Sequence, residues 1–309
     1  MSAPPQRVWA ALGIIYFVWG STYLGIKIAV HTLPPLLTAG TRFLAAASIL
    51  AVVLALKGRS LHVSAREFRS CAVAGLFLLA LGVGIVHVAE TRIDSSVAAM
   101  IAGTVPLQVI LLRTITGDRV SRALRLSTVA GLAGLVLVVA PGLGSGSTAL
   151  GLLASMFAAV SWSVGSFLTP RLELPRDPFV TAVYEMLVGG VLLVGAGLAL
   201  GQWRDLGHGA ITPSALGAWL YLVVAGSVVG FTAYAWLLRV APISLVVTHQ
   251  YVNPLVAIAL GMLFLGERPS PLALAGAALV IGAVYVAVRS ESPARQRARP
   301  LGRELEEAA

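Results

Sequence analysis

Charge and cysteine are scarce in this chain. Only 11% of its 309 residues are charged, and Cys71 is its single cysteine, so no internal disulfide can form. Neither of its two lysines, Lys27 and Lys57, precedes a serine or threonine at the end of a glycine-rich loop. Without such a loop there is no phosphate-binding P-loop, and direct ATP drive is not expected.

Metal-binding and nucleic-acid-binding patterns are missing as well. The sequence contains no HExxH motif, no paired cysteines and no His/Asp cluster, so we expect no metal site and no cofactor. The net charge of +9 alone would suit nucleic acid, but the basic residues lie in short links and in the tail. A nucleic-acid surface needs them on one face with interleaved aromatics, so we expect no such partner.

Long apolar runs dominate what is present. Hydrophobic residues make up 58% of the chain, too many for a soluble globule. A helix of about 20 residues, rising 1.5 Å per residue, crosses the hydrocarbon core of a bilayer. The runs predict an all-α integral membrane protein with ten transmembrane helices. They lie at residues 9–29, 36–56, 71–90, 94–113, 124–141, 149–168, 179–200, 214–238, 242–265 and 271–288.

The basic residues predict the orientation of these helices. With the N-terminus inside, 17 Lys and Arg residues fall on the cytoplasmic side and 3 outside, while Lys27 and Arg42 lie within helices. Basic residues favour the cytoplasmic side, so we expect both termini there. Arginine supplies 20 of the 22 basic side chains, which points to a GC-rich bacterial genome.

The chain divides into two halves of five helices. The uncharged link 142–148 separates residues 1–141 from 149–289, and residues 290–309 read as a disordered cytoplasmic tail. Trp19-Gly20-Ser21 in the first half is echoed by Trp162 and Gly165-Ser166 in the second. Because five is odd, the second half enters the membrane upside down, which predicts an inverted repeat.

Proline interrupts a helix at a matching position in each half. Pro106 and Pro254 lie inside the fourth and ninth predicted helices, and each removes one intrahelical hydrogen bond. Backbone groups freed in this way survive in a membrane only inside protein or beside a water-lined cavity. We therefore interpret the two prolines as helix hinges beside a transport site. Simple kinks, with polar side chains joining neighbouring helices, are the alternative.

Several stretches resemble a known family. These are residues 17–47 (FVWGSTYLGIKIAVHTLPPLLTAGTRFLAAA), 82–90 (GVGIVHVAE), 251–254 (YVNP) and 265–270 (LGERPS), together with the helix around Pro106. They look like the EamA branch of the drug/metabolite transporter superfamily and, within it, the YedA-like exporters. The resemblance spans all ten predicted helices in order. It implies a multi-pass bacterial inner-membrane carrier, with two repeats around a central cavity, that exports amino acids, related metabolites or drugs.

Aromatic and polar residues at mid-membrane depth are candidates for lining that cavity. Trp19 and Trp162 lie well inside their helices, unlike aromatic residues of the membrane interface. We expect the cavity to be lined by Trp19, Ser21, Thr22, Trp162, Tyr234, His249, Tyr251 and Asn253. Ordinary packing of these rings is the alternative.

Charged residues inside the helices are candidates for gating. Such residues are costly in a bilayer and each is a functional suspect. We expect Arg42 to pair with Glu90 near the outer face, with Lys27 as a competitor. By the inversion, Glu185 would pair with Arg239 near the inner face. The pairs would serve as gates or as structural staples.

Proton coupling is a further role for residues in the helices. Glu90 and Glu185 are the carboxylates placed to carry a proton. His87 and His249 would relay it, or would only hydrogen-bond neighbouring helices.

The leading hypothesis is therefore a secondary transporter working by alternating access, and not an enzyme. Its partners would be a small-molecule solute, membrane lipids and a proton or counter-ion. The alternatives are a membrane-embedded enzyme acting on a lipid-like substrate and a passive solute channel. A monomer and a homodimer both agree with the sequence. Export and import do so as well, and the expectation of export rests on the family resemblance.

Overall fold

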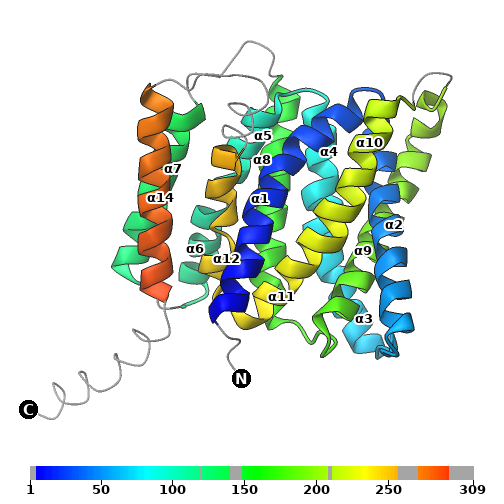
Figure 1. The fold of residues 1–309 in the computed structure, drawn as a ribbon, viewed down its shortest axis with the longest axis horizontal. Helices are drawn as coiled ribbons and strands as arrows, with labels where there is room; N and C mark the ends of the chain where they lie inside the picture. Colours follow the sequence, from blue (N-terminus) through cyan, green and yellow to red (C-terminus); the bar gives the residue numbers. More distant parts are fainter. Residues whose placement is uncertain (1–4, 119, 140–147, 208–210, 257–270, 292–309) are drawn as a thin grey trace, which may run out of the picture.

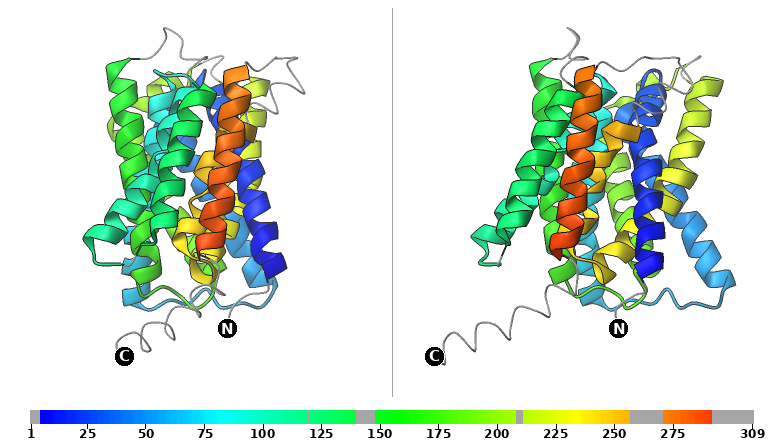
Figure 2. Two further views of the ribbon diagram at one scale, coloured as in Figure 1. Left: turned by 90° about the vertical axis from the view of Figure 1, so that its left-hand side faces the viewer. Right: turned by 60° about the vertical axis from the view of Figure 1, so that its left-hand side comes forward.

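The protein is a bundle of helices whose axes run in roughly one direction. The computed structural model describes residues 5–118, 120–139, 148–207, 211–256 and 271–291. The described residues lie in helices and in the turns and links between them, and include no strand, so the all-α prediction is confirmed. Figures 1 and 2 show the helices side by side, with α7 and α14 at one edge of the bundle and α2 at the other.

The helices follow the predicted apolar runs. The first half contains α1 (Pro5–Val30), α2 (Pro35–Leu56), α3 (Ala65–Gly75), η1 (Leu76–Gly84), α4 (Ile85–Glu90), α5 (Ser95–Ala102), α6 (Val105–Ile115) and α7 (Arg122–Val139). The second half contains α8 (Ala149–Leu168), η3 (Thr169–Arg171), α9 (Pro178–Ala199), η4 (Gln202–Asp205), α10 (Pro213–Tyr221), η5 (Leu222–Phe231), α11 (Thr232–Val240), α12 (Ile243–Val246) and α14 (Pro271–Glu291). Residues 249–256 are also helical.

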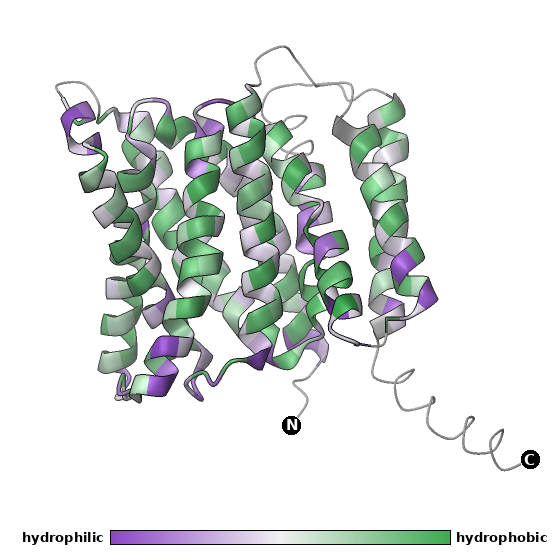
Figure 3. Cartoon of the chain, turned by 180° about the vertical axis from the view of Figure 1, so that it is seen from behind, coloured by the Kyte–Doolittle hydropathy of each residue, from purple (hydrophilic) through white to green (hydrophobic). Residues whose placement is uncertain are grey.

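Six stretches are long and apolar enough to cross a membrane. They are Pro5–Val30, Pro35–Leu56, Ala65–Glu90, Ala149–Arg171, Pro178–Ala199 and Pro213–Val240. Two shorter apolar helices, Val105–Ile115 and Leu274–Ala287, accompany them. Figure 3 shows hydrophobic residues along the helices and hydrophilic ones mainly toward their ends. The chain is therefore an integral membrane protein. The part of the predicted run 242–265 after residue 256 lies outside the described residues, as does the tail after residue 291.

Two long helices contain a wider, π-helical segment at their centre. η1 connects α3 to α4, and η5 connects α10 to α11, without a break in the helix. A π-helix forms its hydrogen bonds between residues i and i+5, which rotates the following side chains relative to an α-helix. The apolar runs gave no sign of these segments, because hydropathy does not distinguish the two kinds of turn.

Two other helices are interrupted. The chain leaves the helical path at Gly103-Thr104, and α6 restarts with Pro106 in its first turn, where a missing N–H costs nothing. In the second half the turn lies at Val247-Thr248, between α12 and residues 249–256, so it precedes Pro254 by six residues. Interruptions occur in both predicted helices, although only the first lies next to its proline.

The backbones of α2 and α9 approach each other closely. A Cβ atom on Gly40 would lie 2.8 Å from the backbone nitrogen of Val194, and one on Gly190 would lie 3.0 Å from the carbonyl oxygen of Gly40. Only glycine allows the two backbones this close, as is common in membrane helix pairs. α7 packs along α14 in a second extensive contact at the edge of the bundle.

The N-terminus of α2 is capped from a distance. Its N-cap residue, Pro34, offers no side-chain hydrogen bond, so the first backbone amides need another acceptor. Gln202 of η4 supplies it, since its Oε1 accepts from the amides of Leu36 (3.0 Å) and Leu37 (3.3 Å).

We expect Gln202→Ala to lower the melting temperature of the purified protein by an amount equivalent to about 1 kcal/mol, the usual cost of a lost helix cap. Gln202→Glu is the matched control, because it keeps the acceptor and adds a negative charge that the helix dipole favours. Thermal unfolding followed by fluorescence would measure both variants. Equal losses in the two variants would contradict the capping role.

Candidate functional site

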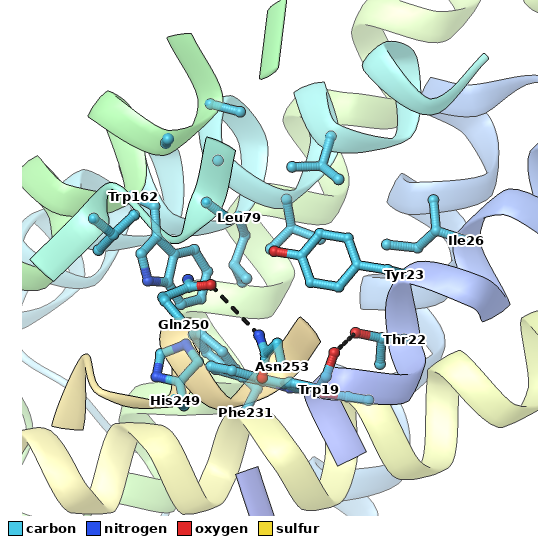
Figure 4. Close-up of a pocket in the computed structure, with 18 of the residues that line it drawn as sticks. Trp19, Thr22, Tyr23, Ile26, Leu79, Trp162, Phe231, His249, Gln250 and Asn253 are labelled. Atoms are coloured by element: carbon cyan, nitrogen blue, oxygen red, sulfur yellow. Dashed lines mark hydrogen bonds between the residues drawn. The ribbon is translucent and has the colours of Figure 1, made fainter. Parts of the chain in front are cut away.

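A cavity of about 700 Å³, counting its open mouth, lies between the two halves of the chain. On α1 its lining extends from Trp19 to Ile26, the half of the helix away from the N-terminus. The described lining residues are Trp19, Thr22, Tyr23, Ile26, Arg42, Phe43, Leu79, Gly82, Val83, Val86, Ala102, Val105, Ser155, Ala158, Ala159, Trp162, Gly226, Phe231, His249, Gln250 and Asn253. Figure 4 shows ten of them by name. The cavity is thus largely apolar with a few polar groups, as is typical of small-molecule sites.

Four rings form a tight cluster at one end of the cavity. The ring of Trp19 lies 5.4 Å from that of Trp162, 5.0 Å from that of Tyr234 and 5.0 Å from that of His249, measured between centroids. Trp162 and Tyr234 are 5.1 Å apart. Such tilted and edge-on contacts suit the charge distribution of aromatic rings. We call Trp19, Trp162, Tyr234 and His249 the aromatic cluster.

The two π-helical segments make room for the two tryptophans. A Cβ atom on Gly230 of η5 would lie 2.5 Å from Nε1 of Trp19, and one on Gly82 of η1 would lie 3.2 Å from Cε3 of Trp162. The indole N–H of Trp19 also donates to the carbonyl of Gly226 in η5 at 2.9 Å. Each half therefore presents a glycine of its π-helical segment to a tryptophan of the other half.

Polar side chains enter the cavity from residues 249–256. The amide Nδ2 of Asn253 donates to Oε1 of Gln250 at 3.4 Å, as Figure 4 shows. The Nδ1 N–H of His249 donates to the carbonyl of Val246, so in the neutral ring Nε2 is left as an acceptor. Three buried polar atoms here have no hydrogen-bond partner: Trp162 Nε1, His249 Nε2 and Asn253 Oδ1. Buried polar atoms are nearly always paired in native proteins, so this group indicates a binding site.

Five of the eight residues predicted to line the cavity do so: Trp19, Thr22, Trp162, His249 and Asn253. The other three lie elsewhere. Ser21 bonds the Tyr221 hydroxyl on α10, while Tyr234 lies within the aromatic cluster, fully buried, with its hydroxyl on Ser166. Tyr251 turns toward α7, where its hydroxyl donates to the carbonyl of Thr128 at 3.2 Å.

The structure does not form the expected pair of Arg42 and Glu90. Both carboxylate oxygens of Glu90 are buried without a hydrogen-bond partner. Arg42 instead uses its Nε to bond Ser227 at 2.8 Å. Lys27, the expected competitor, donates to the main-chain carbonyls of Glu90 and Ile93, each at 2.8 Å, and so caps the end of α4.

The expected pair of Glu185 and Arg239 does not form either. Glu185 is buried, and its Oε1 has no partner. The guanidinium of Arg239 bonds the carbonyls of Pro175 and Arg176 before α9 begins. Arg239 therefore bonds main-chain carbonyl oxygens in place of the Glu185 carboxylate. The positions of the charged residues in the sequence could not reveal this.

His87 lies one helical turn from Glu90 on α4. Its Nδ1 bonds the carbonyl of Val83 at 2.8 Å, and its buried Nε2 has no partner. The positive charge of Arg42 is close enough to act on this ring electrostatically. Among the described residues no three His, Cys, Asp or Glu side chains lie together as a metal site would require.

Several lining residues could not be recognised from the sequence. Phe43, Phe231 and Ser155 line the cavity, but their local sequence does not differ from that of an ordinary apolar helix. On α1, however, a signal exists: Trp19, Thr22, Tyr23 and Ile26 follow the i, i+3, i+4, i+7 spacing of one helix face. Ser21 lies off this face.

Comparison with known proteins identifies similar chains. The model of the EamA-like transporter family matches residues 8–140 and again residues 149–289. The chain is 35% identical over 282 residues to the "Uncharacterized inner membrane transporter YedA" of Escherichia coli K12, covering 90% of both chains. It is 25% identical to the "Probable amino-acid metabolite efflux pump" of Salmonella typhimurium, covering 89% of this chain and 92% of that protein. One solved crystal structure superposes with a TM-score of 0.73 at 20% identity, covering 93% of this chain and 98% of that one, which shows a shared fold.

We expect Gly230→Ala to displace the indole of Trp19, because the new methyl group would overlap it. Overpacking of this kind costs about 1–3 kcal/mol. The near-ultraviolet circular dichroism of the aromatic cluster should weaken and the melting temperature should fall. Gly217→Ala in α10 is the control, since nothing lies within 4 Å of its Cβ position. An unchanged aromatic signal in Gly230→Ala would contradict the packing role.

Proposed function

Since this chain belongs to the EamA-like transporter family, we propose that it is a secondary carrier that exports a small organic solute across the bacterial inner membrane by alternating access. The cavity with its unpartnered polar atoms carries the proposal. A site of this kind, enclosed by helices of both halves at mid-membrane depth, is what a carrier needs to hold its solute.

The names of the relatives support export of a metabolite. The Escherichia coli relative is an inner membrane transporter by name, and the Salmonella relative is named an amino-acid metabolite efflux pump. Both names describe transport and neither describes catalysis. A transporter also accounts for a cavity whose lining contains no carboxylate among the described residues.

The proposed architecture is ten membrane helices in two inverted repeats, 1–141 and 149–289, joined by the link 142–148. Two separate matches of the family model, to residues 8–140 and 149–289, support it. The π-helical segments η1 and η5 also occupy corresponding helices of the two halves. The excess of basic residues in the segments predicted on the side of the N-terminus supports cytoplasmic termini.

With this orientation, the aromatic cluster lies on the cytoplasmic side of the cavity and would close it toward the cytoplasm. Toward that face, Asp118 accepts from Arg171 of η3 at 2.8 Å and lies 3.5 Å from Arg113 of α6. Arg113 also bonds Ser244 of α12, so the network joins the two halves. Opening to the cytoplasm would require these contacts to separate.

Within this mechanism the interruptions near Pro106 and Pro254 serve as hinges, because a broken helix bends at lower cost than a continuous one. Glu90 and Glu185 are the candidates for proton coupling, with His87 beside Glu90. Their burial without ion-pair partners supports this role, since an ionised carboxylate in such a place is costly.

Proteoliposomes loaded with labelled amino acids and aromatic metabolites test the proposal. We expect saturable, selective release. Trp19→Ala should reduce it about tenfold, equivalent to roughly 1.4 kcal/mol of lost binding, whereas Trp9→Ala on the same helix should leave it within about twofold. Trp9 is 49% exposed and lies outside the cavity lining.

Trp19→Phe serves as a milder variant, since it keeps a ring but loses the bond to Gly226. Repeating the assay with a pH gradient tests coupling, because release that follows the gradient and requires Glu90 or Glu185 indicates proton drive. No selective release of any solute would contradict the carrier, and full activity in both Trp19 variants would contradict the placement of its site.

A further inference from the structure

Arg42 is the one charged side chain among the described residues that line the cavity. It is only 3% exposed. Its Nε donates to Ser227 of η5, and its Nη2 would lie 2.8 Å from a Cβ atom on Gly226, which also lines the cavity. Its Nη1 is buried and has no hydrogen-bond partner. The guanidinium is therefore held from one side and left unsatisfied on another.

No carboxylate of the described residues neutralises this cation. Glu90, the partner expected from the sequence, does not line the cavity, and both of its oxygens lack a hydrogen-bond partner. Arginine stays charged in proteins, and a buried unpaired charge is costly. A cation kept in this condition beside a cavity is a natural receptor for an anionic group that arrives with the solute. The planar fork of a guanidinium fits a carboxylate particularly well.

The rest of the lining favours an apolar body on that solute. Phe43, Trp19, Trp162 and Phe231 present ring surfaces, and Leu79 adds an aliphatic one. An ammonium group would find no carboxylate among the described lining residues and would be repelled by Arg42. The unpartnered acceptors of the lining, Asn253 Oδ1 and His249 Nε2, are neutral. These acceptors suit a hydroxyl or N–H donor on the solute instead.

We propose that the cavity binds an amphipathic monocarboxylate, whose carboxylate is held by Arg42 and whose apolar or aromatic body lies against Trp19, Trp162 and Phe43. This assignment names the substrate class of the proposed carrier and so rests on that function. It places carboxylates without an ammonium group ahead of amino acids and of cationic drugs.

Three probes with the same phenyl body test the assignment: 3-phenylpropionate, L-phenylalanine and 3-phenylpropylamine. Binding to the purified full-length protein is measured by isothermal titration calorimetry, and counterflow is measured separately in proteoliposomes. We expect 3-phenylpropionate to bind at least tenfold more tightly than L-phenylalanine, and the amine not to bind. Binding and flux are independent readouts, so binding without flux would support the assignment while contradicting the carrier.

Variants of Arg42 identify the residue responsible. Arg42→Gln should weaken 3-phenylpropionate binding at least tenfold, whereas Arg42→Lys should retain the preference for the acid because it keeps the charge. Arg92→Gln is the matched control: it removes an exposed positive charge just after the end of α4 and should change binding less than twofold. Thermal melting of each variant separates lost binding from lost folding, and Ser227→Ala loosens the guanidinium without removing it.

Three results would overturn the assignment. The first is a preference for L-phenylalanine that is lost in Glu90→Gln, which would make Glu90 the receptor for an ammonium group and leave the carrier intact. The second is equal binding of 3-phenylpropionate to the wild type and to folded Arg42→Gln and Arg42→Lys. The third is failure of all three probes to bind, in which case the mixed-solute release assay would still decide on transport.

Discussion

Every polar group inside a bilayer needs a partner within the protein, and this constraint organises the whole molecule. Hydroxyl groups in the helices find a partner in their own helix. Thr22 donates to the carbonyl of Trp19, and Ser166 donates to the carbonyl of Trp162. Arg239 and Lys27 meet it by capping carbonyl groups at chain turns. Four of the eight described residues that keep an unsatisfied buried polar atom line one cavity, namely Arg42, Trp162, His249 and Asn253. These exceptions to the rule help to mark the site.

The course of the helices could be predicted from hydropathy because lipid demands long apolar runs, and the observed helices follow the predicted ones. Their internal form could not. The π-helical segments η1 and η5 contain Gly82 and Gly230, each of which a tryptophan of the other half approaches, and such tertiary contacts are not visible in hydropathy. The turn at Val247-Thr248 likewise lies away from Pro254, although a proline was the only local signal for a break.

The sequence predicted how deep in the membrane the site residues lie, but only partly which of them face the cavity. Trp19 and Trp162 were identified by their matching depths, and both line the cavity. Ser21 and Tyr251 have suitable depths too, yet each lies on another face of its helix. The charged pairs failed for a related reason, since equal depth on two helices does not bring Arg42 and Glu90 into contact. Which groups meet depends on helix rotation, and the π-helical turns change that rotation.

In the proposed mechanism, one cavity bounded by the aromatic cluster opens to the two sides of the membrane in turn, and cysteine labelling tests this directly. In a Cys71→Ser background, Val86→Cys places a thiol in the cavity lining, and Ala235→Cys places one in α11 next to Tyr234 of the aromatic cluster. A membrane-impermeant maleimide is applied from either face of oriented vesicles, with and without the Asp118→Asn substitution that weakens the cytoplasmic network.

We expect position 86 to react from the outside and position 235 to be protected while Asp118 is intact. Asp118→Asn should raise labelling at 235 from the cytoplasmic face and lower labelling at 86 from the outer face. Labelling of both positions from both faces at once would indicate a continuous channel and contradict alternating access. The same contradiction would follow if Asp118→Asn left both rates unchanged.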